Sequence, residues 1–251
     1  MKHMLALIVC LAGLPAIALG QAAAAAPAGL TVALGGAGTG SPDMVVAIEI
    51  LFLMTLLALA PALLIMATSF TRIIVILHFV RQALGTQQLP PNQLLLGLAL
   101  FLTFFIMKPT FDEMNQEALQ PYLAREITQQ EALQKASVPF KAFMLKQVRE
   151  EDLGLFVRLA KLPRPSTPEE LPLTVVIPGF MISELRLGFQ VGFLVFLPFL
   201  VIDMVVSSVL MSMGMMMLPP IMISLPFKVL LFVLVDGWNL LVGSIVSGFR
   251  V

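Results

Sequence analysis

The chain has 251 residues and no formal net charge; 59% of the residues are hydrophobic and only 12% are charged. This composition is more apolar and less charged than that of ordinary soluble domains, and it predicts a membrane protein. No basic run is present, which argues against nucleic acid as a partner, because phosphate binding needs clustered Lys and Arg.

The first 20 residues predict a secretory signal peptide, since Lys2 precedes an apolar stretch at 5–19 that ends in small residues. Cleavage after residue 20 would also remove Cys10, the only cysteine, and leave the mature chain without disulfides or thiolate metal ligands. An uncleaved membrane helix is the alternative, disfavoured by the shortness of the run. Residues 21–43 are rich in Ala and Gly and predict a linker. The mature N-terminus is therefore expected on the outer side of a bacterial inner membrane.

Residues 44–107 predict a first apolar helical hairpin made of two runs. The first run, 44–80, would be nearly twice as long as the ~30 Å hydrocarbon core if it formed one helix rising ~1.5 Å per residue. It must therefore kink, tilt or protrude, and Pro61 interrupts it. The second run, 94–107, is shorter than a standard membrane span.

Residues 108–172 predict a charged helical insert that faces water on the periplasmic side. The insert holds nine of the 15 Lys and Arg and ten of the 15 Asp and Glu. Thr128 and Glu131 have the spacing of a capping box, which predicts the start of a helix. A second amphipathic helix is predicted by apolar residues at helical spacing, namely Leu153, Phe156, Val157 and Ala160. Prolines between 163 and 172 end this pattern.

Residues 173–251 predict a second apolar hairpin, with runs at 187–213 and 225–249 and a methionine loop at 211–218. Gly214 and the pair Pro219-Pro220 predict a break between the two helices. Five methionines lie within seven residues: Met211, Met213, Met215, Met216 and Met217. Such side chains either fill a core or form a compliant seal, because methionine is unbranched and flexible. Irregular backbone at membrane depth is tolerated where it lines a cavity, which favours the seal.

Charged residues in the apolar runs predict buried ion pairs. Charges at membrane depth mark either pairs or a transport path. No ladder of them follows one helix face, so pairing is favoured, and we hypothesise that Glu184 pairs with Lys228 within one chain or between copies. Gly188 and Gly192 form a GxxxG pattern that permits close helix approach, and Trp238 could anchor an interface. Ordinary bundle packing explains these three residues equally well.

The sequence predicts no catalytic site, no metal site and no cofactor. Only His3 and His78 are present, and His3 leaves with the signal peptide. Neither a catalytic triad nor a histidine metal site has enough partners. Asp203 and Asp236 lie in dissimilar contexts, which argues against an aspartyl protease, and no Gly-rich phosphate loop is present.

Several long motifs carry a resemblance to a known family. They lie at 68–73, 83–88, 143–144, 152–156, 178–185, 192–193, 198–203, 214–220, 225–228 and 235–238. Over nearly everything after the linker, the chain closely resembles the FliP family of flagellar export-gate proteins, related to the SctR subunits of injectisome type III secretion. Gly179, where a residue such as alanine is expected, is a minor departure.

The resemblance implies an all-α fold of kinked membrane-type helical hairpins with an inserted soluble helical domain. It implies a ring-like helical complex of several copies, a pentamer in the family, with FliQ and FliR and further export-apparatus membrane proteins. Such a complex sits in the inner membrane at the flagellar basal body, largely on the periplasmic side, and passes unfolded protein cargo. By the same resemblance the methionine loop is the pore gasket, and Glu184, Lys228 and Asp203 are subunit-contact charges.

A transporter of small molecules or Cu(I) is the alternative function. Thioethers are soft ligands that suit Cu(I). This alternative predicts histidines or cysteines near the entry face, whereas the mature chain would retain one histidine and no cysteine.

Overall fold

The computed structural model describes residues 42–86, 89–163, 167–215 and 218–250, and this part of the chain is helical without any strand. The all-α prediction is confirmed for these residues. The chain divides into two compact units, 1–49 and 50–251. The predicted signal peptide and the linker up to residue 41 lie outside the described residues. Apart from the first turns of α2, every described helix belongs to the second unit.

The long first run is divided into α2 (Pro42–Met66) and α3 (Phe70–Leu84), so the expectation that it cannot form one straight helix is confirmed. The division falls at 67–69, and α2 continues through position 61. At the break the Thr68 hydroxyl donates to the Ile65 carbonyl at 3.1 Å and accepts from the Phe70 N–H at 3.4 Å. This side chain therefore replaces helical bonds that the break removes.

The second run forms α4 (Asn92–Met114), and its helix outlasts the apolar sequence. It continues through Pro109 into the π-helical turn η1 (Asn115–Leu119) and α5 (Gln120–Leu123). Aromatic packing between Phe111 and Phe140, with ring centroids 5.9 Å apart, supports this extension. The apolar run is thus only part of a 32-residue helix, Asn92–Leu123.

The insert contains α6 (Gln129–Gln147), α7 (Glu150–Leu159) and the 3₁₀ turn η2 (Pro168–Glu170). The capping box is confirmed: the Thr128 hydroxyl accepts from the Glu131 N–H at 3.3 Å, and the Glu131 carboxylate accepts from the Thr128 N–H at 2.8 Å. In α7, Leu153 is buried, whereas Ala160 is an exposed C-cap. The amphipathic pattern is therefore one turn shorter than predicted.

The second hairpin consists of α8 (Leu173–Ser212), α9 (Pro220–Leu234) and α10 (Gly237–Ser247). Helix α8 continues through Pro178 and Pro198 for 40 residues, while α9 and α10 meet at an angle of 64°. Among the described residues, Asn92–Leu123 and Leu173–Ser212 are long and apolar enough to cross a membrane. The bent pair α9–α10 would make a third span.

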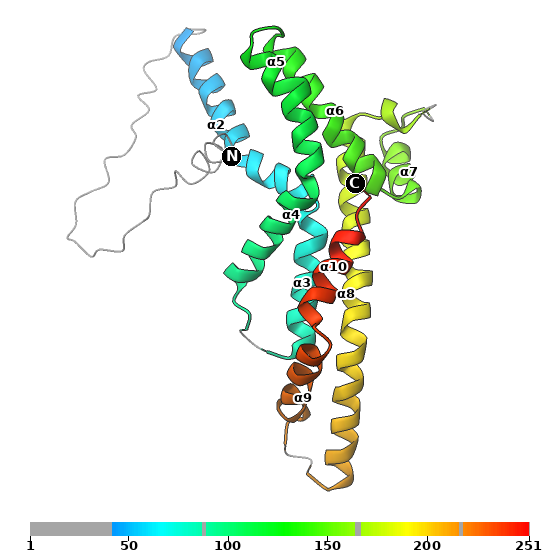
Figure 1. Ribbon diagram of the computed structural model, residues 1–251. Coiled ribbons are helices and arrows are strands. Elements are labelled where there is room, and N and C mark those ends of the chain that lie inside the picture. Colours follow the sequence, from blue (N-terminus) through cyan, green and yellow to red (C-terminus); the bar gives the residue numbers. More distant parts are fainter. Residues whose placement is uncertain (1–41, 87–88, 164–166, 216–217, 251) are drawn as a thin grey trace, which may run out of the picture. The chain divides into compact units, whose positions relative to one another are not determined.

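Helix α3 lies at the centre of the core in the second unit. It packs against α8 and α4, and the insert helices gather at one end of the unit with the α8–α9 turn at the other (Figure 1). One face of α3 is buried at helical spacing by Ile73, Ile76, Leu77 and Val80. Phe143 of α6 packs edge-on against Phe180 of α8, which joins the insert to the same core.

Candidate functional site

The methionine loop begins with a defined turn at the end of α8. The predicted break is confirmed, because α8 ends at Ser212 and α9 begins at Pro220. Gly214 has a φ of 75°, the left-handed conformation that glycine adopts without strain. The Met215 N–H donates to the Leu210 carbonyl at 3.0 Å and the Gly214 N–H to the Met211 carbonyl at 3.1 Å. These two bonds make a Schellman motif, which fixes where Met215 leaves the helix.

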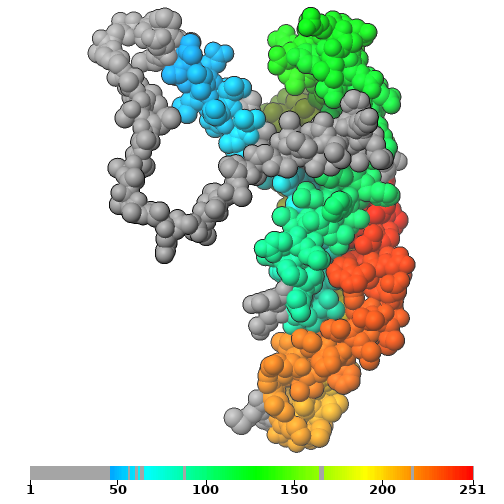
Figure 2. Space-filling view, turned by 60° about the vertical axis from the view of Figure 1, so that its left-hand side comes forward, coloured from blue at the N-terminus to red at the C-terminus, as the bar shows by residue number. Residues whose placement is uncertain are grey.

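The described methionines of this loop are exposed in the single chain. The exposed fractions are 60% for Met211, 61% for Met213 and 41% for Met215. Met216 and Met217 lie outside the described residues. On the face shown in Figure 2, no other described helix covers the end of the unit formed by α8 and α9. The three thioethers therefore do not fill a core within one chain, and they are available to a neighbouring chain, to lipid or to a pore.

The hypothesised pairing of Glu184 with Lys228 within one chain is wrong. Glu184 is fully buried and accepts from Arg72 of α3 through both oxygens, with the Arg72 Nε at 2.8 Å from Oε2 and Nη2 bonded to Oε1. Arg72 is itself buried. The physical reason is the fold. Helix α3 packs against the part of α8 that carries Glu184, so Arg72 of α3 is the cation that lies beside this carboxylate. A two-pronged guanidinium bond is also stronger and better oriented than a single ammonium contact.

Lys228 pairs instead with Asp203, which joins α9 to α8. The Lys228 ammonium lies 2.7 Å from Asp203 Oδ2, and the Ser224 hydroxyl donates to the other oxygen of the same carboxylate. Lys228 and Ser224 are buried. The ammonium also lies 3.6 Å from where a side-chain carbon on Gly85 would stand, at the end of α3. Three helices therefore meet at this one charge.

Sequence reasoning missed Arg72 and Ser224 as members of these pairs. A charge within an apolar run needs a partner, and this requirement alone would have made Arg72 a candidate for Glu184. Ser224 carries no comparable signal, because a serine four residues before a lysine is common on helices.

The predicted packing residues lie at helix contacts within the chain. A side-chain carbon on Gly188 would stand 3.1 Å from Val75, and one on Gly192 would stand 2.5 Å from the Phe79 ring. The GxxxG pattern thus lies where α8 packs closely against α3. Trp238 packs edge-on against Phe232 with centroids 5.3 Å apart, across the bend between α9 and α10.

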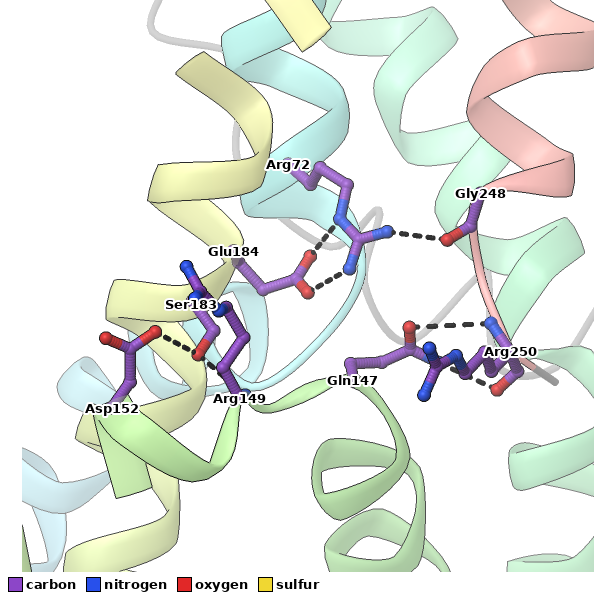
Figure 3. Close-up of polar contacts among 8 residues, drawn as sticks. All are labelled: Arg72, Gln147, Arg149, Asp152, Ser183, Glu184, Gly248 and Arg250. Carbon is purple, nitrogen blue, oxygen red and sulfur yellow. Dashed lines mark hydrogen bonds and ion pairs between the residues drawn. The ribbon is translucent and has the colours of Figure 1, made fainter. Parts of the chain in front are cut away.

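A polar network joins the insert to α8 beside the buried ion pair (Figure 3). The Ser183 hydroxyl donates to Asp152 at 2.8 Å and accepts from the Arg149 N–H at 3.1 Å. Arg186 lies 3.1 Å from the second Asp152 oxygen. The start of α7 is therefore docked on α8 by bonds that are largely shielded from water.

Within the described ranges, no group of three or more His, Cys, Asp or Glu side chains is placed to hold a metal ion. His78 is exposed on α3, with its Nδ1 atom 2.9 Å from the Ile74 carbonyl. The charged groups of Arg72, Glu184, Asp203 and Lys228 are instead used in helix–helix contacts.

Comparison with known proteins gives the family. A model described as the FliP family matches residues 53–245. The flagellar biosynthetic protein FliP of Bacillus subtilis (strain 168) is 58% identical over 202 residues, 80% of this chain and 91% of the relative. That of Caulobacter vibrioides is 54% identical over 235 residues, 94% and 87% of the two chains. The FliP protein of Aquifex aeolicus is 52% identical over 213 residues, which are 84% of this chain and 89% of the relative. The chain belongs to the FliP family.

Membership of the FliP family makes this chain a component of flagellar biosynthesis and export. FliP proteins are not a known enzyme family. Two described helices of this chain are long and apolar enough to cross a membrane, which implies a membrane location. Membership of the flagellar export apparatus implies membrane protein partners. The exposed methionines and the two ion pairs of this FliP-family chain are then features of an export component.

Proposed function

We propose that this chain is a core pore-forming subunit of the flagellar type III export gate, with the methionine loop as its gasket. Five copies form a ring with FliQ and FliR in the inner membrane, with much of the assembly and the insert on the periplasmic side. Unfolded flagellar subunits pass through the ring. Between passages the methionine loops of neighbouring copies close the hole.

The exposure of Met211, Met213 and Met215 at the end of a membrane-capable helix is the observation that carries this proposal. Large apolar side chains at such a position need a partner surface. Thioethers suit a hole that must close around cargo of changing shape, because their three rotatable bonds let them repack. The Schellman turn at Gly214 gives every copy the same starting point for the loop.

The subunit-contact role of Glu184, Lys228 and Asp203 stays a prediction. Glu184 and Lys228 are buried with partners from their own chain. We therefore propose that these two act on subunit contacts indirectly, by setting the positions of α3, α8 and α9. The Asp203 side chain is about a quarter exposed and is the one of the three that a neighbour can reach.

Replacing the loop methionines with alanine tests the gasket. We expect that Met215, Met216 and Met217 changed together to Ala leave assembly intact and raise the leakage of small solutes through the membrane. The matched control changes Met204 and Met222, which are exposed methionines of α8 and α9 that lie outside the loop. Leakage equal to that of the control would remove the sealing role.

Native mass measurement after co-expression with FliQ and FliR tests the assembly. A metal-free complex containing several copies supports the export gate. A monomer loaded with stoichiometric copper would instead support a Cu(I) transporter, the function that thioether ligands alone would suggest.

A further inference from the structure

Three successive residues that follow α10 are held by side chains from α3 and α6 (Figure 3). Arg72 Nη1 donates to the Gly248 carbonyl at 2.9 Å. Gln147 Nε2 donates to the Arg250 carbonyl at 2.7 Å, and the Arg250 N–H donates back to Gln147 Oε1 at 3.4 Å. The guanidinium carbon of Arg72 lies 3.9 Å from the centroid of the Phe249 ring. We name this set of contacts the 248–250 clasp.

The side chains of the clasp are shielded from water, because Arg72, Gln147 and Phe249 are buried, whereas Gly248 and Arg250 are exposed residues. A buried amide or guanidinium group is costly to leave without its hydrogen-bond partner. Gln147 uses both its amide oxygen and its amide nitrogen on the backbone of one residue. A glutamine buried only for its volume would not need this arrangement.

Glu184 orients the Arg72 side of the clasp. The guanidinium group is planar, and two of its nitrogens are bonded to the two oxygens of Glu184. The direction of Nη1 toward Gly248 is therefore set by the ion pair. A lysine at position 72 could keep the charge opposite Glu184 but could not bond both partners in this geometry.

The clasp lies at the far end of an arm that begins at the methionine loop. The chain leaves the loop into α9, turns by 64° at Asp236, continues through α10 and ends in the clasp. Asp236 has a φ of 50°, which lies in the left-handed region that aspartate adopts more readily than most other non-glycine residues. The Lys228–Asp203 pair holds the arm before this bend, and the clasp holds it after.

We propose that Arg72 and Gln147 are positioning residues that couple the insert to this arm. Gln147 is the last residue of α6, so any displacement of the insert is passed to residues 248–250 and from there through α10 to the bend. Loss of the clasp frees α10, relaxes the bend and disturbs the closed position of the loop. The inference rests on the proposed gate function.

Gln147→Leu in the assembled complex is the test, since leucine has a similar volume and makes no hydrogen bond. The matched control is Gln134→Leu, at an exposed position of the same helix. Amide hydrogen exchange is measured along the chain, together with solute leakage and export of flagellar subunits. We expect exchange at 237–250 to rise about tenfold, because both hydrogen bonds between Gln147 and the Arg250 backbone are lost, with exchange at 173–200 unchanged. We also expect leakage to approach that of the methionine variants.

Each other outcome overturns the inference in a recognisable way. Unchanged exchange at 237–250 means that the clasp does not hold α10. Suppose that Gln147→Leu speeds exchange at 237–250 but neither leaks nor alters export, while the methionine variants do leak. The coupling is then disproved, and the gate function stands. If the methionine variants do not leak either, the gasket and the coupling fail together. Should Gln147→Leu fail to accumulate, Gln147→Asn, which withdraws the same amide by one methylene, replaces it.

Discussion

The buried guanidinium group of Arg72 uses all three of its nitrogens, two on Glu184 and one on the Gly248 carbonyl. A buried ion pair of this kind gives little net stability over an apolar pair, but removal of one partner costs about 3–5 kcal/mol. Its effect is therefore to specify which residues of α3 and α8 face each other. Gly188 and Gly192 act on the same contact by a different means, since they let the two helices approach.

Gly192 and Gly179, both on α8, provide a matched pair of substitutions to alanine. Gly192→Ala places a carbon 2.5 Å from the Phe79 ring and 2.9 Å from the Phe79 Cβ, so α3 and α8 must separate. We expect this to lower the free energy of unfolding by about 1–3 kcal/mol. Gly179→Ala meets nothing closer than 3.5 Å and removes a helix-weakening glycine, so we expect a gain of about 0.5–1 kcal/mol.

Thermal unfolding of the purified protein in detergent measures both changes. A lower unfolding temperature for Gly179→Ala than for the unchanged chain would contradict the packing described for α7 on α8.

The helices of this chain begin and end by local devices that differ in chemistry. α6 begins at the Thr128 capping box, and α8 ends in the Schellman turn at Gly214. Both devices satisfy backbone groups that a helix end leaves unpaired. Because each uses residues within one turn of the helix end, neither depends on the tertiary fold.

The capping box predicts a pH dependence at the start of α6. Bonds from the Thr128 backbone N–H and hydroxyl hold the pKa of Glu131 below its ordinary value. A carboxyl group with a lowered folded-state pKa stabilises the fold above its ordinary pKa, and this contribution is lost as the pH falls through the lowered value. We expect protection of the first amides of α6 to decline over that range. Amide exchange measures it, with Glu131→Gln as a control that keeps the box but does not titrate.

The whole chain exposes far more apolar surface than a soluble monomer could. Phe101 and Phe105 on α4, Met222 and Leu234 on α9, and Leu194 on α8 are all more than half exposed. Apolar faces of this extent are covered by lipid or by another chain. A helix that is apolar on every side is stable only with such a covering.

A charge on the apolar face of α4 tests that conclusion. Phe101 is 78% exposed, and Phe101→Asp would bring a charge into lipid or an apolar interface at a cost of about 2.5–3.5 kcal/mol. We expect a severalfold fall in membrane-assembled protein. Leu133→Asp, at a 65% exposed position of the charged insert, serves as the control and should have no effect. Equal yields from quantitative membrane fractionation would show that the α4 face is open to water.

The sequence by itself determined what depends on neighbours along the chain. The helical class, the capping box and the break between Gly214 and Pro219 all follow from apolar runs, prolines, glycines and polar caps within a few residues, whereas the first run divides at 67–69 and not at Pro61. The methionine cluster at 211–217 can also be identified from the sequence alone. The family resemblance, carried by long motifs, led to the correct family.

The tertiary structure alone decided which charges meet. The sequence suggested Lys228 as the partner of Glu184, whereas Arg72, 112 residues away, is the residue that pairs with it. The choice depends on which helix lies against α8 at that level, a consequence of side-chain packing over the whole core rather than of charge. The same holds for Gln147 and the backbone of Arg250, 103 residues apart, since nothing in the spacing of either residue signals the other.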